Sequence, residues 1–155
     1  MIQGICAMLG KRKVRKYAFE LMFGYEFNKE ETAESYYQKA YDSFVCEDDE
    51  EESVKNLFLG ICANVEAIDT VIEKNLSGWK INRISKASLS LMRLSVYEMQ
   101  YANLHHAISI NEAVELAKEY CEDGAATYIN GVLNNIAKNA NDNAKHVFQR
   151  AFRQR

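Results

Sequence analysis

The sequence predicts an all-α fold, and three observations support that class. None of the 155 residues is proline, which interrupts helices more strongly than any other residue. Alanine, leucine, glutamate and lysine, which favour helices, are abundant. Apolar residues recur at positions i, i+3, i+4 and i+7 in several segments, which is the spacing of one buried helical face. With 48% apolar and 26% charged residues, the chain is expected to form one soluble domain.

The first predicted helix spans residues 11–25 and is both amphipathic and basic. Its apolar stripe consists of Val14, Tyr17, Ala18, Leu21 and Tyr25. Its cations are Lys11, Arg12, Lys13, Arg15 and Lys16. The side chains expected to point away from the stripe are Arg12, Arg15, Lys16, Phe19 and Phe23. Residues 1–10, which precede this helix, are expected to form a flexible leader.

This outer face, basic and aromatic together, has two interpretations. Cations near a helix N-terminus oppose the helix dipole and repel one another, so an anionic partner would stabilise them. Aromatic rings beside cations stack on unpaired nucleic-acid bases or cover a partner protein. Alternatively, the rings pack on another helix of the chain and the cations only increase solubility. From this segment alone both interpretations stay open.

A second helix is expected to begin after Asn28, because an N-cap residue followed by Glu31 at the third helical position is typical of a helix start. Its buried stripe consists of Tyr36, Tyr37, Ala40, Tyr41 and Phe44. The acidic run at residues 47–52 lacks the alternating ligands and the glycine of a calcium-binding loop, so it is expected to be a solvated loop.

A third helix over residues 57–76 is expected to end at Ser77 and Gly78, with Asp69 and Glu73 as a surface pair. Ser85 is expected to cap a central helix that is apolar over much of its circumference. Arg93 in that helix needs an acidic partner if it is buried, either Glu98 or a residue of another helix.

The last two helices close the predicted core. Ser109 and Glu112 match a capping box, which predicts that a helix starts there. The final core helix carries the stripe Tyr128, Ile129, Val132, Leu133 and Ile136. Residues 139–155 are expected to be a basic C-terminal extension, either helical or disordered.

Charge is distributed unevenly, although the net charge is only −3. Residues 1–25 contain five cations and one anion, whereas residues 26–53 contain two cations and eleven anions. Such an acidic segment can repel nucleic acid from other surfaces and direct it to the basic helix.

No sequence pattern indicates catalysis, a metal site or a cofactor. The four cysteines are scattered without the spacing of a zinc or dithiol site, and glycine-rich phosphate loops and nucleophile motifs are absent. We therefore expect a protein that is not an enzyme and has free thiols in the cytoplasm. No run approaches the roughly 20 apolar residues that a membrane span needs.

The order of several motifs resembles the NusB family of transcription antitermination factors over about residues 11–138. After the basic start of the first helix come Gly60-Ile61-x-x-Asn64-x-x-x-Ile68-Asp69, Trp79-x-Ile81-x-Arg83-Ile84 and Leu91-Met92-Arg93-Leu94-x-x-Tyr97-Glu98. The most specific motifs are Ile110-Asn111-Glu112-Ala113-Val114-Glu115-Leu116-Ala117-Lys118 and Asn130-Gly131-Val132-Leu133.

The resemblance implies a compact helical domain of two roughly perpendicular three-helix bundles. It also implies a non-catalytic factor that binds boxA-like single-stranded RNA of ribosomal RNA operons. Its implied partners are a NusE-type small-subunit ribosomal protein and the RNA polymerase antitermination complex.

The resemblance also points to site residues. It assigns RNA binding to Lys11, Arg12, Lys13 and Arg15, to which the outer face adds Lys16, Phe19 and Phe23. For the protein partner it points to Phe23, Ser88 and Asp123. Ser88 is neutral where the family usually carries an acid, and Thr127 stands where the family usually carries a basic residue.

Two other functions are compatible with the sequence. One is a helical protein–protein adaptor or homodimer, in which Phe19 and Phe23 are buried in the interface. The other is an RNA-binding accessory domain for a ribosomal RNA methyltransferase, because NusB-like domains also precede the catalytic domains of such enzymes. In that case the activity would come from a separate polypeptide.

Overall fold

The structure is a computed structural model that describes residues 2–41 and 48–153, with side chains for residues 12–40 and 50–144. All regular structure in these residues is helical, as the sequence predicts. The α-helices are α1 (Ile2–Tyr25), α2 (Ala33–Tyr41), α3 (Asp48–Ala63), α4 (Val65–Lys74), α5 (Lys86–Tyr101), α6 (His106–Tyr120) and α7 (Ala125–Arg153). A short 3-10 turn, η1, covers Ile81–Arg83.

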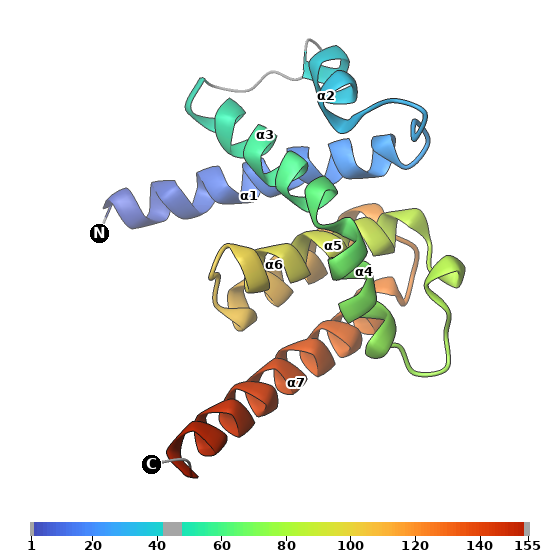
Figure 1. Ribbon diagram of the computed structural model, residues 1–155. Coiled ribbons are helices and arrows are strands. Elements are labelled where there is room, and N and C mark those ends of the chain that lie inside the picture. The colour runs from blue at the N-terminus through green and yellow to red at the C-terminus, as the bar shows by residue number, and fades with distance from the viewer. Residues whose placement is uncertain (1, 42–47, 154–155) are drawn as a thin grey trace.

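Two groups of helices meet at α5 (Figure 1). Helices α1, α2 and α3 pack on one another, and α4, α6 and α7 gather with α5. Both α1 and α3 also contact α5, which joins the two groups. The perpendicular arrangement of two bundles stays a prediction, whereas the all-helical fold is confirmed.

Helix α5 is the central helix that its apolar sequence predicts. Its buried residues run almost without interruption from Ser88 to Met99. Ser85 caps the helix as expected, because its hydroxyl oxygen accepts a hydrogen bond from the Ser88 amide at 3.2 Å. Ser95 on this helix meets Ser109 of α6 through a buried hydroxyl pair at 2.8 Å.

Arg93, near the middle of α5, is neutralised by acids from other segments. Its Nε and Nη2 donate to both carboxylate oxygens of Asp69 in α4, at 2.7 and 2.8 Å. Its Nη1 donates to Glu26 at 2.6 Å. The acids that pair with Arg93 therefore come from α4 and from the segment that follows α1, and Asp69 is not the surface pair with Glu73 that the sequence predicts.

Helix α1 begins at Ile2. Residues 2–10, which were expected to belong to a flexible leader, are therefore the first residues of this helix. Thr32, and not Asn28, caps α2, because the Thr32 hydroxyl accepts from the Ser35 amide at 3.2 Å. Asn28 instead donates to the carbonyl of Gly24 at 2.8 Å and closes the end of α1. The expected stripe residue Phe44 lies outside the described residues.

The third predicted helix is divided in two at Asn64, where α3 ends and α4 begins. The Asn64 side chain donates to the Gly60 carbonyl at 2.8 Å, which is the local competition that makes asparagine unfavourable inside helices. Helix α4 then ends at Lys74, before the predicted stop at Ser77 and Gly78. Residues 48–52 were expected in a loop, but they form the start of α3. Negative charges are favourable there, because they interact with the positive end of the helix dipole.

The last helices also differ from their predicted bounds. Helix α6 begins at His106, because the His105 side chain accepts from the Ala107 amide at 3.3 Å and acts as the cap. Ser109 therefore lies inside the helix, and the predicted capping box is wrong. Helix α7 continues to Arg153, so the C-terminal extension is helical as far as the structure describes it, and it projects from the packed helices (Figure 1).

Candidate nucleic-acid interface

Three cations of α1 remain accessible on its surface. The side chains of Arg12, Lys13 and Lys16 are 57%, 42% and 43% exposed. They border a furrow of about 350 Å³ between α1 and α6. The side chain of Lys11 is not among the described ones, so its expected role is not tested.

Each of these three cations meets an acid from another helix. Arg12 donates from Nε and Nη2 to the two carboxylate oxygens of Glu112, both at 3.0 Å. Lys13 lies 3.3 Å from Glu50 of α3, and Lys16 lies 3.9 Å from Glu119 of α6. The surface is therefore basic but partly neutralised from within the molecule.

Arg15 does not share this exposed position. It is only 5% exposed, and its Nε lies 2.8 and 2.9 Å from the two carboxylate oxygens of Glu98 in α5. The expectation that Arg15 points outward is wrong, because α1 is covered by α5 on that side. Arg15 anchors the basic helix to the core.

The aromatic residues of α1 divide between the core and the surface. Phe19 is 3% exposed and packs on Tyr120 of α6 with ring centroids 5.1 Å apart, so it does not lie on the outer surface, and the alternative that the ring packs on another helix holds for Phe19. Phe23 is 38% exposed, in keeping with its expected position. Its ring meets Phe27, which is 63% exposed, edge to face at 5.3 Å.

Phe23, Phe27 and Lys86 together form an aromatic patch, in which Phe27 and Lys86 were not predicted from the sequence. The Lys86 ammonium lies 4.4 Å from the centroid of the Phe27 ring, which is a cation–π distance. Phe27 continues the i, i+4 spacing of Phe19 and Phe23, so the pattern could have revealed it. Lys86 is the first residue of α5, and it places the patch beside the start of that helix.

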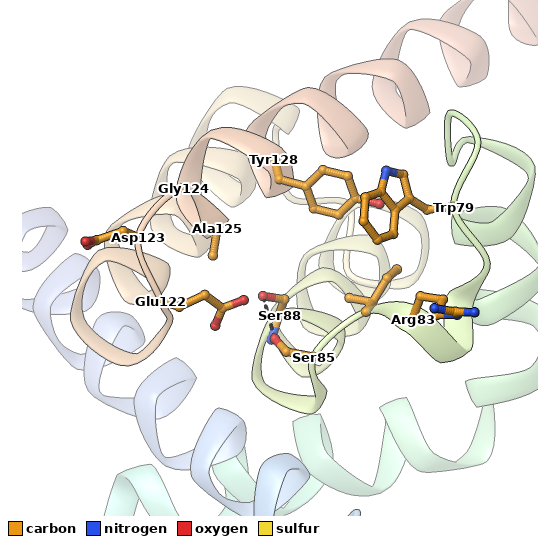
Figure 2. A pocket seen from close by; sticks show the side chains of 10 residues that line it. Trp79, Arg83, Ser85, Ser88, Glu122, Asp123, Gly124, Ala125 and Tyr128 are labelled. Carbon is orange, nitrogen blue, oxygen red and sulfur yellow. Dashed lines mark hydrogen bonds between the residues drawn. The ribbon is translucent and has the colours of Figure 1, made fainter.

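A separate cavity of about 360 Å³ is lined in part by Ser88 and Asp123, two of the residues expected to bind a protein partner. Ser88 is buried and pairs with the Ser85 hydroxyl at 2.9 Å. Figure 2 shows Glu122 pointing toward Ser88, whereas the Asp123 carboxylate points away from the cavity. Phe23 does not line this cavity.

The wall formed by α7 contributes an unsatisfied polar atom. The hydroxyl oxygen of Tyr128 is buried and has no hydrogen-bond partner among the described residues. Trp79, which is exposed, lines the cavity on the side of η1 (Figure 2). A partner group that entered here would find both an apolar ring and an unsatisfied hydroxyl.

Metal and membrane sites are not found in the part of the chain that the structure describes. That part has no group of three or more His, Cys, Asp or Glu side chains that could hold a metal ion. None of its helices is both long enough and apolar enough to cross a membrane. Burial raises the pKa of the Cys62 thiol to about 11, so this thiol is protonated at neutral pH.

Fold and site together define a small helical domain with a basic and aromatic surface on its first helix. The chain belongs to the NusB family, whose family model matches residues 12–138. The motifs that suggested this family therefore reflect membership. Residues 139–155, which include the projecting end of α7, lie beyond the matched segment.

Similar proteins include a relative from Listeria monocytogenes serotype 4a, named transcription antitermination protein NusB. It is 38% identical over 128 residues, covering 82% of this chain and 95% of the relative. A solved structure of T. maritima NusB matches with a TM-score of 0.75 at 29% identity, covering 82% of this chain and 89% of that one. A structure of NusB and NusE in complex with double-stranded RNA matches with a TM-score of 0.75 at 26% identity, covering 84% and 98%.

Proposed function

We propose that this chain is a non-catalytic RNA-binding transcription antitermination factor. It binds boxA-like single-stranded RNA of ribosomal RNA operons together with a NusE-type ribosomal protein, as part of an RNA polymerase antitermination complex. The observation that carries the proposal is the accessible row of Arg12, Lys13 and Lys16 on α1. Family membership supports it, because relatives are named as antitermination proteins and one similar structure contains NusE and RNA.

In this proposal the residues of α1 have two roles. Arg12, Lys13 and Lys16 contact phosphates, and the half-exposed Phe23 offers a ring for stacking. Arg15 and Phe19 hold the helix in place from beneath, since both are buried. Lys11 keeps its expected role as a phosphate contact.

An RNA titration at several salt concentrations tests the RNA-binding surface. The triple substitution Arg12→Ala, Lys13→Ala and Lys16→Ala should weaken binding of a boxA-like strand and lower the salt slope by about 0.7 for each lost phosphate contact. The matched control is Lys74→Ala, Lys80→Ala and Lys138→Ala, which removes the same charge from exposed positions elsewhere. Equal losses in both variants would reject α1 as the RNA site.

We further propose that the NusE-type partner docks against Phe23 and against the separate cavity lined by Ser88 and Asp123. The cavity beside Ser88 and the exposed Phe23 support this proposal. Calorimetry with the ribosomal protein should show weaker binding for Phe23→Ala and for Asp123→Asn. Tyr101→Ala is the control, because Tyr101 is an exposed aromatic residue at the other end of α5. An unchanged affinity for both test variants would reject this proposal.

Sedimentation distinguishes the proposed RNA-binding function from the homodimer alternative. The proposed factor should bind RNA without self-association through the Phe23 surface. A dimer that persists when RNA is saturating, and that Phe23→Ala dissociates, would favour the adaptor or homodimer function instead.

A further inference from the structure

The furrow between α1 and α6 is lined by opposite charges in two rows. Cations from α1 form one row, and three acids of α6 form the other, Glu112, Glu115 and Glu119. Their spacing of i, i+3 and i+7 places the acids on one face of α6. This acidic row faces the residues that we propose bind RNA.

The contacts across the furrow differ in strength. Arg12 and Glu112 form a two-bond pair, and Glu112 is only 7% exposed, so this contact is firmly held. The bond with Glu112 raises the pKa of Arg12, and the charge of Glu115 raises it further. Lys16 and Glu119 are 3.9 Å apart and both largely exposed, so this pair is easily separated.

A phosphate group that approaches α1 must therefore compete with carboxylates that already hold the same cations. Glu115 and Glu119 are exposed and line the same furrow, so they also act on an incoming phosphate by repulsion, although Glu115 is partly neutralised by Lys118 of its own helix at 2.9 Å. A ligand with one or two phosphates gains little from this exchange. A strand that also stacks on the aromatic patch and presents several phosphates gains enough to displace the acids.

We propose that the acidic row of α6 is a specificity-determining element of the RNA site, which lowers affinity for polyanions in general and so favours the cognate strand. This inference rests on the proposed function, because it requires that α1 binds RNA. The acids of the row compete with RNA phosphates for the cations of α1, and the row does not itself bind RNA. Without it, binding becomes tighter and less selective.

The test variant is Glu115→Gln with Glu119→Gln, which removes two exposed carboxylates and keeps the side-chain shape. The control variant is Glu66→Gln with Glu73→Gln, which removes two exposed carboxylates of α4, a helix that does not line the furrow. Both variants change the net charge equally. Helicity and thermal stability of both are compared with those of the unmodified protein first.

Fluorescence titration with a boxA-like strand and an unrelated strand of equal length then measures affinity and selectivity. We expect the Glu115 and Glu119 variant to bind both strands about three- to tenfold more tightly, with the larger gain for the unrelated strand. We expect the control to gain less than about twofold.

The possible outcomes distinguish a failure of the proposed role of the acidic row from a failure of the proposed RNA binding. Equal gains in both variants, or no gain in the test variant, would overturn the competitor role while leaving RNA binding intact. Equal gains for the two strands would reject its role in specificity. If the unmodified protein bound neither strand, both the proposed function and this inference would fail.

Discussion

At the scale of single residues, the feature that most constrains function is the burial of Arg15. Its guanidinium and the Glu98 carboxylate neutralise each other beneath α1, and both are almost inaccessible to solvent. A charge that is buried with its partner is costly to leave alone. Arg15 therefore stabilises the fold, whereas Arg12, about one helical turn earlier, lies at the surface.

Substitution of Arg15 tests this division of roles. Arg15→Ala should lower the free energy of unfolding by about 3–5 kcal/mol, because it removes the guanidinium that neutralises the buried Glu98 carboxylate. Urea denaturation measures this loss, and Lys16→Ala is the control that should leave the midpoint almost unchanged, because Lys16 and Glu119 are 3.9 Å apart and both exposed. A small effect for Arg15→Ala would mean that the pair is not buried in solution.

Glu26 gives a prediction about pH. Burial disfavours its charge, but Lys29 and Arg93 outweigh burial and hold its pKa below the usual value. Because the folded pKa lies below the unfolded one, the stabilisation is present above the unfolded pKa and is lost as pH falls through the folded value.

Glu26→Gln should therefore lower stability at neutral pH by about 1–3 kcal/mol and flatten the loss of stability under acid. Urea unfolding at a series of pH values down to about pH 3 measures both effects. Glu30→Gln, at an exposed neighbouring position, is the matched control. Parallel pH curves for Glu26→Gln and the unmodified chain would contradict the assignment.

Residue positions also show what the sequence could and could not predict. The pattern placed Val14, Tyr17, Ala18 and Leu21 against the core correctly, because one apolar stripe is enough for that. It failed for Arg15 and Phe19, because other helices cover α1 on more than one side. A helical wheel describes one helix and contains no information about which neighbours surround it.

At the scale of elements, the close contact between α1 and α2 is set by Gly24. A Cβ at this position would collide with the hydroxyl oxygen of Tyr36, while the ring carbon that carries the hydroxyl would remain at an ordinary 3.4 Å. The Tyr36 ring is held by Tyr25 and Phe58, at centroid distances of 5.3 and 6.1 Å. The hydroxyl alone therefore makes alanine unfavourable here.

This contact predicts a coupled pair of substitutions. Gly24→Ala alone should destabilise the protein by about 1–3 kcal/mol through the collision. In a Tyr36→Phe background the same change should stabilise it by about 0.5–1 kcal/mol, because alanine favours helix more than glycine does. Thermal unfolding of the four proteins measures the coupling, and simple additivity would contradict it.

Element boundaries were predicted less well than element identity. Asn28 and Ser109 match a cap pattern in the sequence, yet Thr32 and His105 cap the two helices. The choice depends on packing: Ser109 is buried against Ser95, so the helix has to start before it. Such contacts join residues far apart in the sequence and leave no local signal.

At the scale of the whole molecule, α5 connects the two helix groups. Helices from both groups contact it, and ion pairs connect it to both: the buried pair of Arg15 with Glu98 and the partly buried pair of Arg93 with Asp69. The candidate sites share this framework, since α1 carries the basic surface while α5 and α7 form the cavity beside Ser88.

We expect the molecule to unfold in one transition. The only tryptophan, Trp79, lies at the cavity between η1 and α7, so its fluorescence reports on that end of the molecule. Circular dichroism reports on all helices together. The two urea unfolding curves should coincide, and a separate early change in tryptophan emission would show that the helix groups unfold independently.

The projecting part of α7 has a consequence for distance measurements. From Asn139 to Arg153 the helix advances by about 1.5 Å per residue, which carries the end of the chain about 22 Å beyond the segment shared with the family. A fluorophore attached near Arg153 would therefore stand clear of both the basic helix and the cavity. It could serve as a fixed reference point for measuring, by energy transfer, where each end of a bound strand lies.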